Sequence, residues 1–213
     1  MAQRRAMIIG GAGFVGTSLV ARLLGRGYDI DVVDNLSTSH SDSLMEFVDW
    51  RTFRFLRGDI SDPEVFDLLT YRPKVDEIYH LACPLHVTDS SLDTEMLDAC
   101  FVGTEHALEL ARLWDAIVVY ARPERKTSDD RGFCEKLVKA ETEKFSIDSR
   151  IIRISDTYGP RMSPNDQRVI PQFLAAALRG QAVTIYGNGS HTRRFLFVDD
   201  LLNAIQAVVD DGV

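Results

Sequence analysis

The sequence predicts an α/β fold, a doubly wound parallel sheet followed by a small, truncated appendage. Short apolar runs alternate with segments of helical periodicity over about the first 155 residues, as in strands joined by crossover helices. A glycine-rich turn, residues 10–16, joins the first apolar run to the first helical segment. The chain has 213 residues, of which 45% are hydrophobic, and this is enough for one such domain with a core of its own.

The glycine-rich turn has the composition of a phosphate-binding loop. It follows a predicted strand at 6–9 and precedes a predicted helix at 14–24, and its glycines recur at every third position. Residues without a Cβ let the backbone approach a pyrophosphate, and the helix offers N–H groups and its positive dipole end to that anion. The residues that we assign to this site are Gly10, Gly13, Phe14, Val15 and Gly16. The alternative is a tight strand-to-helix turn without a ligand.

An acidic residue ends the second predicted strand, residues 30–33. Asp34 lies 18 residues after Gly16, close to where dinucleotide-binding folds place the carboxylate that accepts from the adenosine ribose. A carboxylate repels a 2′-phosphate, so this position favours NAD over NADP. The alternative is a solvated acid at a strand end.

The remaining elements of the predicted sheet follow in order. We expect strands at 53–56, 75–81, 116–120 and 151–154. We expect helices at 44–48, 62–69, 92–113 and 133–145, and a surface loop at 122–131. In the helix at 133–145 the spacing predicts that Phe133, Leu137, Val138 and Ala140 face inward and that Glu135 faces outward.

The pattern changes after residue 155, so the predicted domains are 1–155 and 156–213. The second part has turns at 158–160 and 164–166, a helix at 169–178, and strands at 183–186 and 195–198. Asp199 is expected to cap a last helix.

Composition argues against several classes of function. The net charge of −8 includes no concentrated basic face, so nucleic acid is not an expected partner. The cysteines Cys83, Cys100 and Cys134 form no C-x-x-C pair, which argues against a disulfide framework and a metal site. No apolar run reaches the roughly 18 residues of a membrane span. We therefore expect a cytoplasmic protein.

Several stretches make the sequence resemble a known family. The glycine turn and residues 32–37, 76–84, 157–166 and 186–193 resemble the extended short-chain dehydrogenases/reductases, a family of Rossmann-type NAD-dependent epimerases, dehydratases and decarboxylases. Within that family they look most like the UDP-glucuronate decarboxylases (UDP-xylose synthases). The resemblance implies NAD as cofactor, a UDP-sugar as ligand and a homodimer through a four-helix seam of helices 92–113 and 133–145.

The resemblance also assigns roles by position. Besides the turn, the positions that match NAD-binding residues are Asp34, Asn35, Asp59, Ile60, Leu81 and Ala82. The candidates for nucleotide-sugar binding are Asp156, Arg168, Tyr186 and Arg193. Asp156 replaces the family's asparagine, and Arg168 is included because arginines beside loops of an acidic chain suit an anionic ligand. Core packing for Tyr186 and a solvated surface charge for Arg193 stay open.

The chain departs from the family where its catalytic residues stand. Members use a Ser/Thr, a Tyr and a Lys, the last two spaced Y-x-x-x-K, and this spacing occurs nowhere in the chain. Phe133 and Leu137 occupy the tyrosine and lysine positions, and residues 121–124 (Ala-Arg-Pro-Glu) replace the Ser/Thr.

Three functions therefore remain open, and whether the protein is an enzyme is uncertain. The first is a catalytically degenerate member that keeps ligand sites and has a binding, regulatory or scaffold role. The second is an enzyme with rearranged residues, for which Cys83, His86 and Lys136 are the spare reactive groups. The third is conventional decarboxylase or epimerase activity through groups aligned differently.

Overall fold

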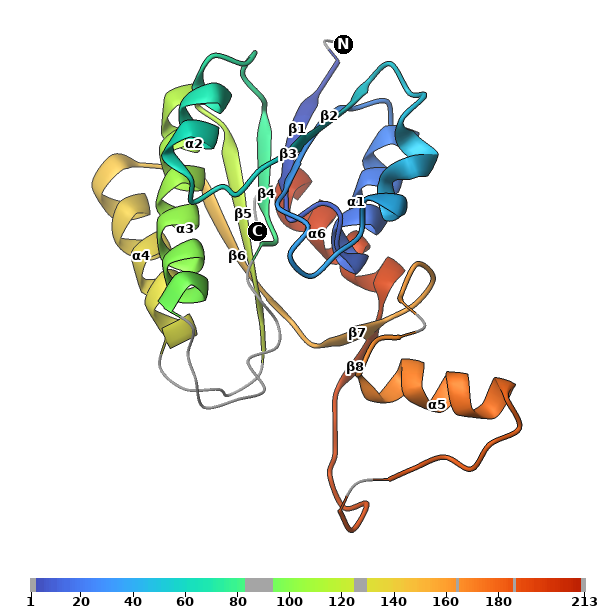
Figure 1. The fold of residues 1–213 in the computed structure, drawn as a ribbon. Helices are drawn as coiled ribbons and strands as arrows, with labels where there is room; N and C mark the ends of the chain where they lie inside the picture. Colours follow the sequence, from blue (N-terminus) through green and yellow to red (C-terminus); the bar gives the residue numbers. More distant parts are fainter. Residues whose placement is uncertain (1–2, 83–93, 125–129, 164, 186, 212–213) are drawn as a thin grey trace.

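A computed structural model describes residues 3–82, 94–124, 130–163, 165–185 and 187–211 (Figure 1). Its main sheet is parallel and has the strand order β3-β2-β1-β4-β5-β6. The strands are β1 (Arg5–Ile9), β2 (Asp29–Asp34), β3 (Phe53–Arg57), β4 (Glu77–His80), β5 (Ile117–Pro123) and β6 (Ser149–Ile154). The helices are α1 (Phe14–Gly25), the 3₁₀-helix η1 (Ser41–Phe47), α2 (Pro63–Thr70), α3 (Thr94–Trp114), α4 (Asp130–Phe145), α5 (Val169–Leu178) and α6 (Val198–Asp211). The predicted doubly wound α/β fold is confirmed.

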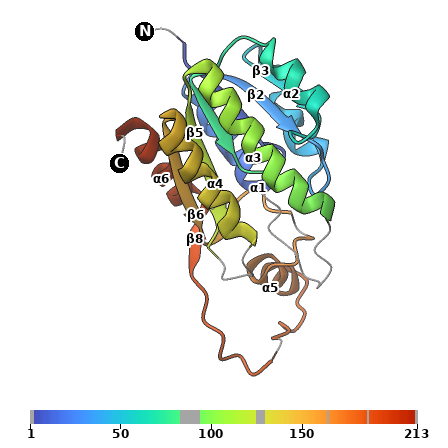
Figure 2. The same cartoon turned by 90° about the vertical axis from the view of Figure 1, so that its left-hand side faces the viewer.

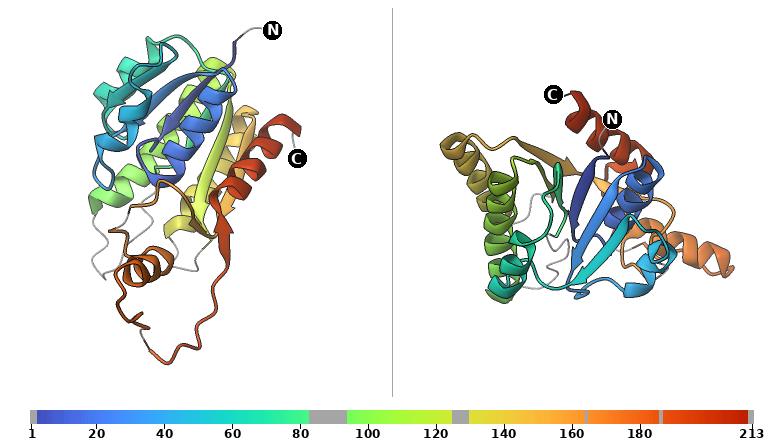
Figure 3. Two further views of the ribbon diagram at one scale, coloured as in Figure 1. Left: turned by 90° about the vertical axis from the view of Figure 1, so that its right-hand side faces the viewer. Right: turned by 90° about the horizontal axis from the view of Figure 1, so that it is seen from above.

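Helices cover both faces of the sheet. Helices α1 and α6 lie on one face and α2, α3 and α4 on the other (Figures 1 and 3). Neighbouring residues of β1 point to opposite faces, so Ile8 packs into the core under α1 and α6 while Ile9 packs into the core under α3 and α4. Both side chains are buried, as the continuous apolar runs of a two-sided parallel sheet require.

The last helix lies against the first. Its apolar face enters the core beside α1 through Leu201, Leu202, Ile205 and Val209. Charged groups secure both ends of α6. Arg22 donates to Asp199 at 2.9 Å and to Asn203 at 2.6 Å, and Asp210 accepts from Arg4 and Arg26, each at 3.1 Å.

The appendage lies beyond the carboxyl ends of the main strands (Figures 1 and 2). It contains α5 and a small parallel sheet of β7 (Asp156–Tyr158) and β8 (Phe195–Phe197). The predicted strand at 183–186 is wrong for its described residues, because 183–185 have no strand partner and the side chains of Val183 and Ile185 are exposed. Tyr158 ends a strand where we expected a turn to begin, and Asp199 lies in the first turn of α6 instead of capping it. The boundary between residues 155 and 156 stays a prediction.

Helix α4 faces the sheet differently from the prediction. Phe133 is 56% exposed and Ala140 is also exposed, whereas Glu135 is 6% exposed. The physical reason is that β5 continues to Pro123, past the predicted loop start, and brings Arg122 opposite Glu135. An ion pair therefore sets which side of the N-terminal half of α4 is buried, while Val138 is buried as expected.

No helix in the part of the chain that the structure describes combines the length and the apolar character needed to cross a membrane.

Candidate functional site

The glycine-rich turn lies where the strand order reverses, between β1 and β4. The Gly10 N–H donates to the Val33 carbonyl at 2.8 Å, and Gly10 has a φ of +80°. A Cβ on Gly10 would lie 2.7 Å from the backbone nitrogen of Ala82. Only glycine combines this positive φ with so close an approach to the Ala82 backbone. Open α/β sheets bind ligands in the crevice at the point where the strand order reverses.

Two of the other glycines in the turn are closely packed, and one faces open space. A Cβ on Gly11 would lie 2.7 Å from the Val32 side chain, and one on Gly16 would lie 2.4 Å from the Gly10 carbonyl oxygen. A Cβ on Gly13 would meet nothing within 4 Å except that same oxygen, at 3.5 Å. Gly13 is the N-cap of α1, and no side chain caps the helix. The helix N-terminus is therefore open on the side of Gly13, where an anion fits.

Asp34 anchors the turn to the second strand. Its carboxylate, 8% exposed, accepts from the Ala12 N–H at 2.9 Å, the Leu36 N–H at 2.8 Å and the Ser39 hydroxyl at 2.9 Å. A carboxylate has about four acceptor sites, so roughly one remains for a ribose hydroxyl. The sequence pointed to Asp34 but gave no sign of its structural hydrogen bonds.

Asn35 and Asp59 extend the same edge. The Asn35 amide donates to Asp59 at 2.7 Å, and Ser61 donates to Asp59 from its N–H at 2.9 Å and its hydroxyl at 2.6 Å. Partial burial opposes the charge of the Asp59 carboxylate, but the hydrogen bonds from Ser61 and Asn35 outweigh it and lower the pKa of Asp59. The group is thus an ionised acceptor whose orientation is fixed.

The other predicted cofactor residues lie around the strand ends. Ile60 is buried and packs on the α3 side of the sheet, while Leu81 and Ala82 are partly buried just after β4. The Leu81 N–H donates to the Ile9 carbonyl at 2.9 Å, which continues the β1–β4 pairing to the turn. The open helix N-terminus, the spare acceptor of Asp34 and the close glycine packing together fit a dinucleotide.

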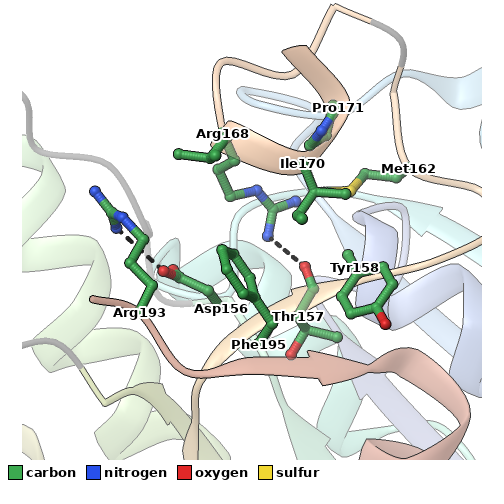
Figure 4. Close-up of a pocket in the computed structure, with 10 residues that line it drawn as sticks. Asp156, Thr157, Tyr158, Met162, Arg168, Ile170, Pro171, Arg193 and Phe195 are labelled. Carbon is green, nitrogen blue, oxygen red and sulfur yellow. Dashed lines mark hydrogen bonds and ion pairs between the residues drawn. The ribbon is translucent and has the colours of Figure 1, made fainter. Parts of the chain in front are cut away.

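A second site lies between β7, β8 and α5 (Figure 4). Two predicted ligand residues meet there, because Arg193 Nη1 lies 3.1 Å from Asp156 Oδ2. Apolar side chains close the rest of this pocket, namely Met162, Ile170, Pro171 and Phe195. The pocket therefore combines an apolar wall with a paired cation.

Arg168 connects this pocket to the glycine turn. Its guanidinium donates to Asp166 through Nε at 3.0 Å and through Nη2 at 2.7 Å, and to the Thr157 carbonyl at 3.3 Å. The same group lies over the Phe14 ring, 5.6 Å from its centre. Arg168 thus fixes the start of α5 relative to α1. Tyr186, Cys83 and His86 lie outside the described residues.

An ion cluster occupies the inner side of α4, next to Phe133 and Leu137 in the sequence. Glu135 accepts from Arg122 at 2.7 Å, from Arg153 at 2.7 Å and from Lys139 at 3.0 Å. Hydrogen bonds from Arg153, followed by the other cations, lower the pKa of Glu135 to about 2. Helical spacing does not reveal this cluster, because the cluster depends on the pairing of Arg122 with Arg153 across β5 and β6.

The residues that we expect at the family's tyrosine and lysine positions, Phe133 and Leu137, have apolar side chains. The Phe133 ring lies 5.4 Å from the ring of Phe101, centre to centre, and Leu137 is half-buried beside the core under α3 and α4. Lys136 is exposed. Among the residues that the structure describes, no group of three or more His, Cys, Asp or Glu side chains could hold a metal ion.

A buried histidine ends β4 near the turn. His80 Nε2 lies 3.1 Å from the Thr104 hydroxyl, which donates to the Cys100 carbonyl, so we assign the proton to Nε2. Its Nδ1 has no hydrogen-bond partner among the described residues. Complete burial lowers the pKa of His80 to about 4, so His80 is neutral at pH 7.

Comparison with protein families gives two matches that follow one another along the chain. The model for GDP-mannose 4,6 dehydratase matches residues 7–121, and the model for the NAD dependent epimerase/dehydratase family matches residues 133–213. Among curated relatives, UDP-glucuronic acid decarboxylase 4 of Arabidopsis thaliana is 33% identical over 97% of this chain and 51% of its own length. UDP-glucuronic acid decarboxylase 1 of Xenopus tropicalis is 30% identical over 99% of this chain and 55% of its own. The chain thus spans about half the length of these relatives.

Solved structures agree in fold. WbmF of Bordetella bronchiseptica, determined with NAD+ and UDP, is 26% identical, with a TM-score of 0.84 over 100% of this chain and 70% of its own. UDP-glucose 4-epimerase of Thermotoga maritima, determined with UDP-glucose, has a TM-score of 0.85 at 23% identity, over 97% of this chain and 73% of its own. The reversed strand order, the glycine turn and these matches lead to one conclusion. The chain belongs to the extended short-chain dehydrogenase/reductase family of epimerases and dehydratases, whose cofactor is NAD.

Proposed function

We propose that this chain binds NAD at the glycine turn and a UDP-sugar in the pocket of β7, β8 and α5. In this proposal it is a member of the UDP-glucuronate decarboxylase type that has lost ordinary proton transfer and has a binding, regulatory or scaffold role. Residues 1–155 form the cofactor unit and residues 156–213 the nucleotide-sugar unit. One observation carries the proposal, namely that no tyrosine of the chain has a lysine four residues further on. The residues that we assign to the two positions, Phe133 and Leu137, lie beside the Glu135 ion cluster.

In this proposal each of the two units binds one of the two ligands. NAD, when bound, supplies a hydride acceptor. The open N-terminus of α1 suits its pyrophosphate, and the spare acceptor of Asp34 suits its adenosine ribose. Arg193 suits the diphosphate of a sugar nucleotide, and the apolar wall of the pocket suits a base.

We expect proton abstraction from a sugar hydroxyl to be the step that this chain has lost. Phe133 has no hydroxyl, and a carboxylate with a pKa of about 2, as in Glu135, is too weak a base at neutral pH. His80 is neutral but 1% exposed and enclosed by the core.

Binding and turnover measured separately test the proposal. We expect calorimetry to detect NAD and then UDP-glucuronate, and nuclear magnetic resonance to detect no conversion of UDP-glucuronate to UDP-xylose. A curated decarboxylase relative, assayed in parallel, is the positive control. Turnover by this chain would refute the loss of catalysis. In that case Cys83→Ala, His86→Gln and Lys136→Gln would test the alternative of an active enzyme with rearranged residues.

We also propose a homodimer whose seam is formed by α3 and α4. Large apolar side chains on these helices are exposed, among them Leu113 at 53%, Phe133 at 56% and Phe145 at 42%. Light scattering at micromolar concentration tests this, and a monomer would refute it. The proposal places the protein in a reducing compartment such as the cytoplasm, which cell fractionation tests.

A further inference from the structure

Both arginines of the second pocket are already paired within the protein. Its two arginines, Arg168 and Arg193, each face an aspartate of the same region. Arg168 donates to Asp166 and to the Thr157 carbonyl, so its guanidinium is engaged within the protein and is less available to a ligand. Within the part of the chain that the structure describes, Arg193 has one ion-pair partner, Asp156, at 3.1 Å (Figure 4).

The neighbouring arginine does not add charge to this pocket. Arg194 pairs with Glu124 at 2.6 Å, and its side chain is 82% exposed. The side chains of Arg193 and Asp156 are 36% and 23% exposed, so a ligand in the pocket can reach both of them.

We propose that Asp156 is a specificity-determining residue that lowers the affinity of this pocket for diphosphate groups by occupying Arg193. The inference rests on the proposed function for the identity of the ligand. A diphosphate must replace Asp156 as the partner of Arg193, and Asp156 then lies beside a second anion. Like charges placed together oppose binding, so ligands with less negative charge at this point are favoured.

The charge of Asp156 can be removed with little change of shape. Asp156→Asn keeps the size of the side chain, releases Arg193 and supplies an amide that can donate to a phosphate oxygen. Asp67→Asn is the matched control, because it makes the same change of net charge on the exposed side of α2, away from the pocket. Calorimetry with UDP, inorganic pyrophosphate and uridine separates the charge of the ligand from its base.

We expect Asp156→Asn to bind UDP and pyrophosphate about tenfold more tightly than wild type, with uridine unchanged. Asp67→Asn should bind all three ligands as wild type does. Arg193→Gln should cost little affinity in wild type, where Arg193 is already neutralised, and about tenfold in the Asp156→Asn background. Wild type, the two single variants and the double variant form a double-mutant cycle, so the conclusion does not depend on one variant. Urea unfolding checks that each protein is folded.

The outcomes separate the two proposals. Unchanged or weaker binding of pyrophosphate and UDP by Asp156→Asn would overturn the role of Asp156, even if wild type binds UDP-sugars. Equal costs of Arg193→Gln in both backgrounds would also overturn it. Tighter pyrophosphate binding by Asp156→Asn, with no preference of any variant for UDP, would support the role of Asp156 and refute the nucleotide-sugar part of the proposed function.

Discussion

Two glycines of the same turn have opposite predicted responses to alanine. In Gly16→Ala the new Cβ would lie 2.4 Å from the Gly10 carbonyl oxygen and 2.6 Å from the Gly11 Cα, both backbone atoms that cannot turn away. Overpacking of this kind costs about 1–3 kcal/mol or more, against a gain of up to about 1 kcal/mol from the helix propensity of alanine. We expect Gly16→Ala to lower the free energy of unfolding by about 2 kcal/mol.

Gly13→Ala should leave stability almost unchanged and weaken cofactor binding. Its Cβ has only an ordinary contact of 3.5 Å, and its φ of −73° is accessible to alanine. A reduced entropy of the unfolded chain stabilises by about 0.4–1 kcal/mol, and the poorer N-cap costs a similar amount. The methyl group fills the space in front of α1, so a pyrophosphate loses one or two charge-assisted hydrogen bonds. At about 1.5–3 kcal/mol each, this weakens NAD binding by at least about tenfold.

Urea unfolding without ligand and calorimetric titration with NAD measure the two effects independently. Wild-type NAD affinity in Gly13→Ala would refute the placement of the pyrophosphate at this helix terminus. Wild-type stability in Gly16→Ala would refute the packing of the turn itself.

Three further predictions concern buried charges and pH. First, His80 has a pKa of about 4 in the folded protein, against about 6.5 in the unfolded chain. The free energy of unfolding should therefore be highest above pH 6.5 and fall by about 3 kcal/mol as the pH falls to 4. Urea unfolding at several pH values should show this dependence in wild type and not in His80→Gln. Second, Glu135 has a pKa of about 2 against an ordinary 4.5, so its stabilisation is present above pH 4.5 and is lost towards pH 2. Glu135→Gln should cost about 2 kcal/mol at pH 7, a value reduced for the exposure of Arg153 and Lys139, and an unchanged unfolding midpoint would contradict the cluster. Third, Arg168→Gln should lower the free energy of unfolding by about 1–2 kcal/mol and weaken the binding of both ligands, because it releases α5 from Thr157 and Phe14. Arg161→Gln is the control, since it loses only an exposed ion pair with Glu46. Calorimetry should show unchanged NAD binding in Arg161→Gln.

The sequence was sufficient for the sheet because its strands are buried on both faces. Apolar runs such as 6–9, and 30–33 with its single Asp31, predict buried strands of a parallel sheet when helices alternate with them, and the glycine turn marks the crevice. The same local reasoning failed for 183–186, where the described residues 183–185 (Val-Thr-Ile) have β-branched side chains but no strand to pair with. A strand needs a partner, and the sequence does not state which segments meet.

Pairings between distant charges were equally hidden. Helical spacing predicts that Glu135 faces solvent. Glu135 is buried because the pairing of β5 with β6 places Arg122 beside Arg153, and both arginines donate to its carboxylate. Asp156 and Arg193 were both expected to face a ligand, but their pairing with each other depends on the contact of β7 with β8. Ion pairs join residues by spatial distance, and this information is absent from any short window of sequence.

The contact of the last helix with the first has a consequence for synthesis on the ribosome. Residues 198–211 are translated after the strands and helices of residues 5–197, yet they cover part of the apolar surface shared by Leu19, Val20 and Leu23. Until they emerge, the nascent chain presents that surface to chaperones and proteases, and the support beneath the glycine turn is incomplete. A chain released after residue 197 would lose Leu201 and Ile205 from this core, and we expect its quality control in the cell to resemble that of an unfinished domain.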